Sequence, residues 1–127
     1  MSEIKLNGKK YELLMSGEAH FAIDELSKGK PAEAIAGNDL QSFRTLCRMT
    51  VELANAAERY HRWLGDDTQP ELTAEEVMVT LSPMGVQRLR KAVYEAISDG
   101  YKRGVGEDED VDLGLAELNQ KKTNAAR

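Results

Sequence analysis

The opening segment, residues 3–13, constrains the fold most because it predicts a β-hairpin. Two short alternating runs flank Asn7-Gly8, and both residues of this dipeptide readily adopt the positive φ of a two-residue turn. In that register Leu6 lies opposite Lys9 and the apolar side chains share one face. This face consists of Ile4, Leu6, Tyr11 and Leu13. Because a two-stranded hairpin alone is marginal in water, the rest of the chain must cover it.

The composition narrows the class of protein. A chain of 127 residues forms one domain, and 41% hydrophobic with 31% charged residues suits a soluble globular protein. The net charge of −5 argues against a protein that neutralises many phosphates of a nucleic-acid backbone. The single cysteine, Cys47, is expected to be buried, and the lack of a disulfide pair fits the cytoplasm. We expect no signal peptide, and no apolar run reaches the ~18 residues of a membrane span.

The residues after the hairpin predict helices. Ser16 caps a helix over residues 17–28, and Pro31 begins a short one that ends near Ile35. A long helix begins after Asn38 or Asp39 and ends at about residue 64, which makes it the expected centre of the fold. Its predicted inner stripe consists of Phe43, Leu46, Cys47, Thr50, Leu53, Ala54, Ala57, Tyr60 and Leu64. Its predicted polar face consists of Arg44, Arg48, Glu52, Asn55, Arg59 and Arg62.

The second half predicts two more helices. After a polar loop at residues 65–70, Thr73 and Glu76 form a capping box for a helix that reaches residue 81. Ser82-Pro83 begins the last helix, and Gly100 is expected to end it. We therefore predict an α+β fold, mostly α, with the hairpin packed on four to five helices over residues 1–103. Residues 104–127, with an acidic run at 107–112, are predicted to be a mobile tail.

The sequence predicts no catalytic, cofactor-binding or metal-binding residue, so we expect a protein that is not an enzyme. His20 and His61 lie on different predicted helices without a second ligand at metal-binding spacing. Adjacent carboxylates on a helix do not face each other. Two such pairs are Asp24-Glu25 and Glu75-Glu76. The acidic run lacks the glycine and the final glutamate of a calcium loop.

The end of the long helix carries the candidate partner-binding residues. Trp63 is expected either to pack beneath the loop at residues 65–70 or to form an exposed anchor with Tyr60. Arg59 and Arg62 lie beside them, and Trp, Tyr and Arg dominate binding hot spots. The rim of the hairpin is a second candidate, because exposed strand edges can also join copies into a homo-oligomer.

Residues 72–92 favour an alternative function, DNA binding. Two predicted helices joined by a short turn are typical of a helix-turn-helix, and the second carries Arg88, Arg90 and Lys91. Pro83 in the turn and the acidic net charge argue against this interpretation. Its hydrophobic spacing is shared with any helical hairpin.

The chain resembles the tail assembly chaperones of long-tailed phages, prophages and gene-transfer particles in the order of four features. They are the hairpin from Ile4 to Leu13, Ile23-Asp24-Glu25-Leu26 before Gly29-Lys30, a long helix, and the stretch from Leu72 to Val77. The resemblance covers roughly residues 3–100, and the Ser-Lys-Gly-Lys segment departs slightly from the family pattern.

The resemblance implies a function in assembly without catalytic residues. Such proteins bind the tape-measure protein and the tail-tube subunit in the bacterial cytoplasm, and are absent from the mature virion. A tape measure is a long helical chain with exposed apolar stripes, which a small helical protein can cover.

Overall fold

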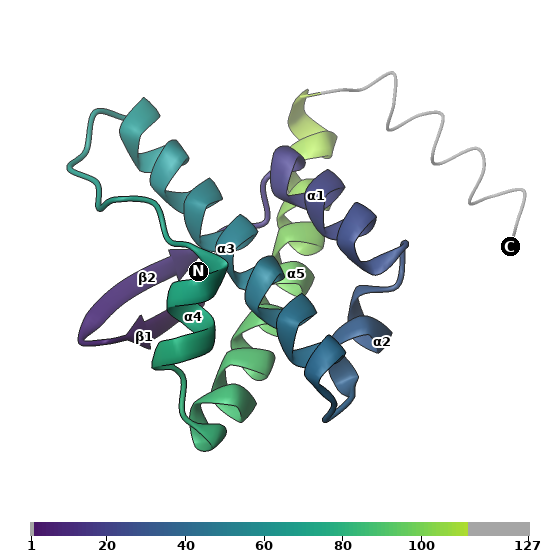
Figure 1. Cartoon of the computed structure of the whole chain (residues 1–127). Coiled ribbons are helices and arrows are strands. Elements are labelled where there is room, and N and C mark those ends of the chain that lie inside the picture. Colours follow the sequence, from purple (N-terminus) through teal and green to yellow (C-terminus); the bar gives the residue numbers. More distant parts are fainter. Residues whose placement is uncertain (1, 112–127) are drawn as a thin grey trace, which may run out of the picture.

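A computed structural model describes the backbone of residues 2–111 and the side chains of residues 2–102. Its elements in chain order are β1 (Ser2–Leu6), β2 (Lys9–Leu13), α1 (Gly17–Ser27), α2 (Pro31–Ala36), α3 (Leu40–Trp63), α4 (Ala74–Thr80) and α5 (Pro83–Val111). The hairpin and five helices confirm the predicted mostly helical α+β fold (Figure 1).

The hairpin has the register that the sequence predicted. β1 and β2 are antiparallel with Leu6 opposite Lys9, and the turn residues Asn7 and Gly8 have φ values of 50° and 80°. The side chains of Leu6, Tyr11 and Leu13 are buried, and that of Ile4 is half-buried. β1 packs against α5 and β2 against α3, so two helices cover the apolar face.

The predicted N-caps form. Each cap side chain accepts a hydrogen bond from the backbone N–H three residues later, which satisfies a donor that the helix leaves free. The pairs are Ser16 with Ala19 (3.1 Å), Asp39 with Ser42 (3.3 Å), Thr73 with Glu76 (3.2 Å) and Ser82 with Gly85 (3.0 Å). Asp39 is therefore the cap of α3, rather than Asn38.

α3 is the centre of the fold, as expected, because it contacts β2 and the other four helices (Figure 1). The predicted inner stripe holds for its first five turns. It is wrong at the C-terminal end, where Tyr60 and Leu64 are exposed because no other described element packs over that side of the last turns. The predicted polar face is wrong at Asn55, which is buried.

Asn55 is buried because it joins α3 to the loop that follows. Its Oδ1 accepts a hydrogen bond from the Leu72 N–H at 2.9 Å, and its Nδ2 donates to the Leu72 carbonyl at 3.0 Å. Leu72 is itself buried and stands just before α4. One side chain therefore satisfies two backbone groups that lie away from water.

Gly100 does not end α5, which continues to Val111. The glycine has a different role, since a Cβ at this position would overlap Met15 Cβ and lie 2.6 Å from Met15 Cγ. The helix therefore approaches the β2–α1 connection closely, and a glycine inside a helix lowers stability without necessarily breaking it.

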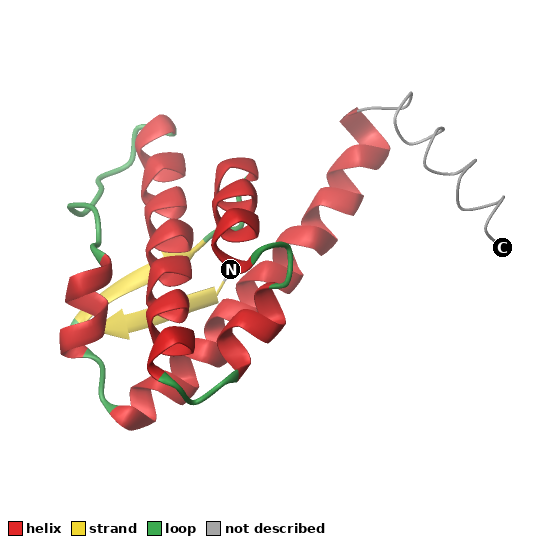
Figure 2. Ribbon diagram, turned by 45° about the vertical axis from the view of Figure 1, so that its right-hand side comes forward, coloured by secondary structure: helices red, strands yellow, loops and turns green. Residues whose placement is uncertain are grey.

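The end of α5 extends beyond the other elements (Figure 2). Residues 104–111 continue this helix, whereas residues 112–127 lie outside the described part of the chain. The side chains of the acidic run are not described either. The boundary between the domain and the tail at residue 104 stays a prediction.

Candidate interaction surface

Tyr60 and Trp63 lie one helical turn apart at the end of α3, so their side chains project from the same face. Tyr60 is 44% exposed and Trp63 is 82% exposed. The ring of Trp63 therefore does not pack beneath the loop at residues 65–70. Exposed aromatic side chains of this size favour contact with a partner, because their burial on binding removes a large apolar area from water.

A groove runs beside these two rings. It has a volume of about 260 Å³ and lies between α3 and the connection from β2 to α1. The lining residues are Leu14, Ser16, Glu18, Ala56, Arg59, Tyr60 and Trp63. Leu14 and Ala56 are buried and supply apolar contact inside the groove, while the aromatic rings stand more exposed. The site thus combines a hollow with adjacent side chains that a partner can contact.

Arg59 and Arg62 differ in their surroundings. Arg59 forms an ion pair with Glu18 of α1 and another with Glu71 at 3.5 Å, so it joins both walls of the groove. Exposed ion pairs add little stability, but these two fix where the Arg59 guanidinium lies. Arg62 is exposed and has no ion-pair partner among the described residues. Arg62 is therefore free to meet a carboxylate of a partner.

His61 fastens the hairpin to the end of α3. Its Nε2 lies 2.7 Å from Glu12 Oε2 of β2, and its Nδ1 lies 3.1 Å from Asp66 Oδ2. Hydrogen bonds to the Glu12 and Asp66 carboxylates raise the pKa of His61. The protonated ring can donate to both carboxylates at once, whereas the neutral ring has one N–H.

Replacing His61 with glutamine should destabilise the fold more at about pH 5.5 than at about pH 8.5. A raised pKa in the folded state contributes stability that is fully present below the unfolded pKa of about 6.5 and is lost as the pH rises through the folded value. Urea unfolding at both pH values measures the difference. Arg62→Gln is the control, since Arg62 is exposed on the same helix and forms no ion pair among the described residues. Equal destabilisation of His61→Gln at both pH values would contradict the prediction.

The residues predicted for DNA binding separate into two groups. Arg90 donates hydrogen bonds to the Gly37 carbonyl at 3.1 Å and to Asn38 Oδ1 at 3.4 Å, so it fastens α5 to the α2–α3 connection. Arg88 and Lys91 are exposed and have no ion-pair partner among the described residues. Two of the three cations are therefore available to a ligand. α4 packs mainly on α3, rather than on the helix that bears these residues.

The remaining chemical candidates lie apart from the groove. Cys47 is buried as predicted, and burial raises the pKa of its thiol to about 11, which disfavours a reactive thiolate. His20 lies on α1, where its Nδ1 is 3.2 Å from the Tyr101 hydroxyl of α5. No group of three or more His, Cys, Asp or Glu side chains that could hold a metal ion occurs within the described residues.

Sequence reasoning identified one wall of the groove and missed the other. Tyr60, Trp63 and Arg59 were candidates, and the structure brings them together along α3. The opposite wall, from Leu14 to Glu18, became part of the site only through packing of the β2–α1 connection beside α3. A backbone hydrogen bond from the Leu14 N–H to the Leu53 carbonyl, at 3.0 Å, joins this connection to α3.

Comparison with protein-family models, with curated proteins and with solved structures finds no match to the chain. No helix within residues 2–111 is both long enough and apolar enough to span a membrane.

Proposed function

We propose that the chain is a non-enzymatic assembly chaperone that binds the tape-measure and tail-tube proteins during phage tail morphogenesis. The observation that carries the proposal is Trp63, which is 82% exposed beside the groove. The family resemblance supplies the kind of partner. The same proposal has the protein act in the cytoplasm of the bacterial host and remain outside the mature virion.

The groove suits an amphipathic helix of the tape-measure protein. Such a helix can place apolar side chains against Leu14 and Ala56 while Tyr60 and Trp63 cover its flank. Its polar side can present a carboxylate to the exposed Arg62. Covering an apolar stripe in this way keeps a long helical partner soluble until the tube assembles.

Replacing Trp63 with serine should weaken partner binding by about 30-fold, because truncating a central aromatic hot spot typically costs about 2 kcal/mol or more. Stability should change little, since the ring is exposed in the free protein. The measurement is co-expression with a phage tape-measure protein, followed by pull-down and assay of the soluble partner. Val79→Ser is the matched control, because Val79 is 74% exposed on α4, away from the groove.

A tape-measure protein that is soluble alone and does not co-purify with the wild-type chain would contradict the proposal. DNA binding then becomes the leading alternative. Its test is a mobility-shift assay with the double variant Arg88→Ser and Lys91→Ser, which removes two exposed cations and leaves Arg90 in its structural contacts.

A further inference from the structure

The outer edge of β1 has backbone groups without partners. In a two-residue hairpin the pair beside the turn is hydrogen-bonded, and the pairs alternate from there along the ladder. Leu6 is in that first pair, so Glu3 and Lys5 belong to the alternate pairs and direct their N–H and C=O groups away from β2. No hydrogen bond from these groups to another described element is present. The edge therefore offers donors and acceptors at the spacing of an extended strand.

The edge of β2 is different because other elements occupy it. The Lys10 carbonyl accepts a hydrogen bond from Gln69 Nε2 at 2.7 Å, and the Glu12 carboxylate contacts His61 of α3. The loop after α3 thus lies along β2 and leaves less of its edge free. Of the two edges in the described hairpin, β1 is the one open to another strand.

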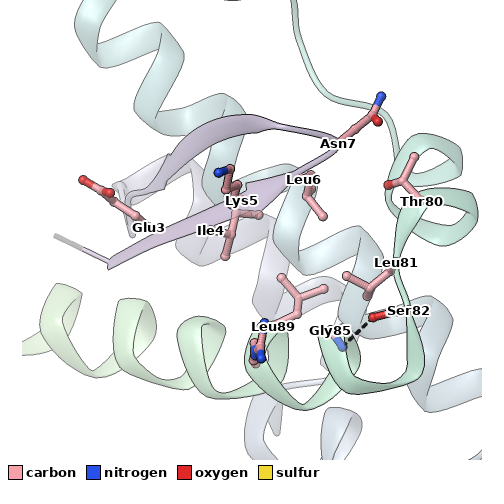
Figure 3. Close-up of a pocket in the computed structure, with 11 residues that line it drawn as sticks. Glu3, Ile4, Lys5, Leu6, Asn7, Thr80, Leu81, Ser82, Gly85 and Leu89 are labelled. Carbon is pink, nitrogen blue, oxygen red and sulfur yellow. Dashed lines mark hydrogen bonds between the residues drawn. The ribbon is translucent and has the colours of Figure 1, made fainter.

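A groove of about 310 Å³ lies along β1 between the strand, the α4–α5 turn and the first turns of α5 (Figure 3). Leu6, Leu81 and Leu89 point into the space between the strand and the helix (Figure 3). Gly85 lets Leu81 lie close to α5, because a Cβ there would be 2.9 Å from Leu81 Cδ1. The groove therefore has an apolar side next to the free edge.

The charged residues of this groove favour an acidic ligand. Lys5 and Arg88 both line it, and neither has an ion-pair partner among the described residues. Among the described residues that line the groove, Glu3 is the one carboxylate, so the lining carries two cations and one anion. A carboxylate near Arg88 gains a charge-assisted hydrogen bond without displacing an existing partner.

We propose that the outer edge of β1 binds an extended segment of a partner protein, with apolar side chains at alternate positions and a carboxylate. The segment adds a third strand through hydrogen bonds to Glu3 and Lys5, and places alternate side chains against Leu81 and Leu89. Its carboxylate pairs with Arg88. This site is separate from the groove beside Trp63 and does not depend on the proposed function.

The test uses peptides, so that it remains independent of any tail protein. A library of random ten-residue peptides is selected against the full-length chain, and the affinity of enriched peptides is measured by fluorescence anisotropy. We expect enriched peptides to alternate apolar and polar residues and to include an acidic one. Lys5→Pro should weaken the affinity for these peptides by about tenfold or more, because proline removes the outward N–H and blocks the edge of β1.

Lys10→Pro is the matched control, since Lys10 lies directly opposite Lys5 and its outward N–H is on the edge of β2. The affinity of the Lys10→Pro variant for the enriched peptides should stay within about twofold of wild type. Neither strand addition at β1 nor the contact with Arg88 involves Lys10. Lys5→Thr keeps the N–H and should lose about threefold at most. Should Lys5→Pro fail to fold, a double-mutant cycle decides the proposal. It combines the Arg88→Ser variant with peptides in which an amide replaces the carboxylate.

Three results would overturn this proposal. The first is equal binding of the enriched peptides to wild type and Lys5→Pro. The second is the absence of enriched alternating peptides. The third is concentration-dependent dimerisation of the wild type that Lys5→Pro abolishes, since a second copy of the chain would then occupy the edge.

Discussion

Replacing Asn55 with alanine should lower the free energy of unfolding by about 3 kcal/mol. The Asn55 side chain satisfies both the N–H and the C=O of Leu72, at 2.9 and 3.0 Å, and both residues are buried. Alanine leaves two backbone groups without partners in a place that water does not reach, and each costs about 1–3 kcal/mol. Urea unfolding followed by circular dichroism measures the loss.

Arg48→Ala is the control for Asn55→Ala because Arg48 is exposed on the same helix. It should change stability by less than about 0.5 kcal/mol. A loss below about 1 kcal/mol for Asn55→Ala would show that the loop relaxes and returns Leu72 to water. Asn55→Asp offers a further comparison, since it keeps the acceptor for the Leu72 N–H but replaces the donor to its carbonyl.

Replacing Gly100 with valine should also destabilise the fold, by about 3 kcal/mol. A Cβ at this position would overlap Met15 Cβ, and Met15 belongs to the buried connection between β2 and α1. The overlap involves the base of the side chain rather than its flexible end, so α5 or the connection must shift. The small gain in helix propensity over glycine, about 0.4 kcal/mol, does not offset this strain.

Thermal unfolding of Gly100→Val against Ser98→Val isolates the effect of close packing. Ser98 is exposed on the same helix, so valine there tests the helix propensity alone. A melting temperature for Gly100→Val equal to that of Ser98→Val would contradict the close approach of α5 to Met15.

Local sequence patterns predicted the elements that depend on local chemistry. The Asn7-Gly8 turn fixes the hairpin register through two positive φ values, which needs no information from the rest of the chain. The caps at Ser16, Thr73 and Ser82 likewise act within four residues. Such signals are legible in a single sequence because cause and effect lie close together along the chain.

The sequence predictions were wrong where residues far apart in the chain decide whether a side chain is buried or a helix ends. Asn55 has the spacing of a polar face, yet the chain returns seventeen residues later and buries it against Leu72. Gly100 has the usual place of a helix stop, but Met15 makes it a point of close packing. Tyr60 continues the apolar stripe of α3, yet it remains 44% exposed because no element within residues 2–111 covers it. Helical periodicity shows which residues share a face and says nothing of what lies opposite.

The candidate interaction surface also has one part that the local sequence predicts and one part that depends on distant packing. Tyr60 and Trp63 could be selected from residue type and from their position at the end of a helix. The second wall of the groove could not, because Leu14 and Glu18 reach α3 only when the β2–α1 connection packs against it. The edge of β1 was a candidate as part of the hairpin rim, but the occupied edge of β2 required the Gln69 contact with Lys10.

The covering of β1 by α5 has a consequence for how the chain is made. Synthesis proceeds from the N-terminus, so the hairpin leaves the ribosome before the helices that bury its apolar face. A hairpin without that cover is marginally stable in water. The apolar face of the nascent hairpin therefore lacks the part of its cover that α5 supplies until α5 has been translated.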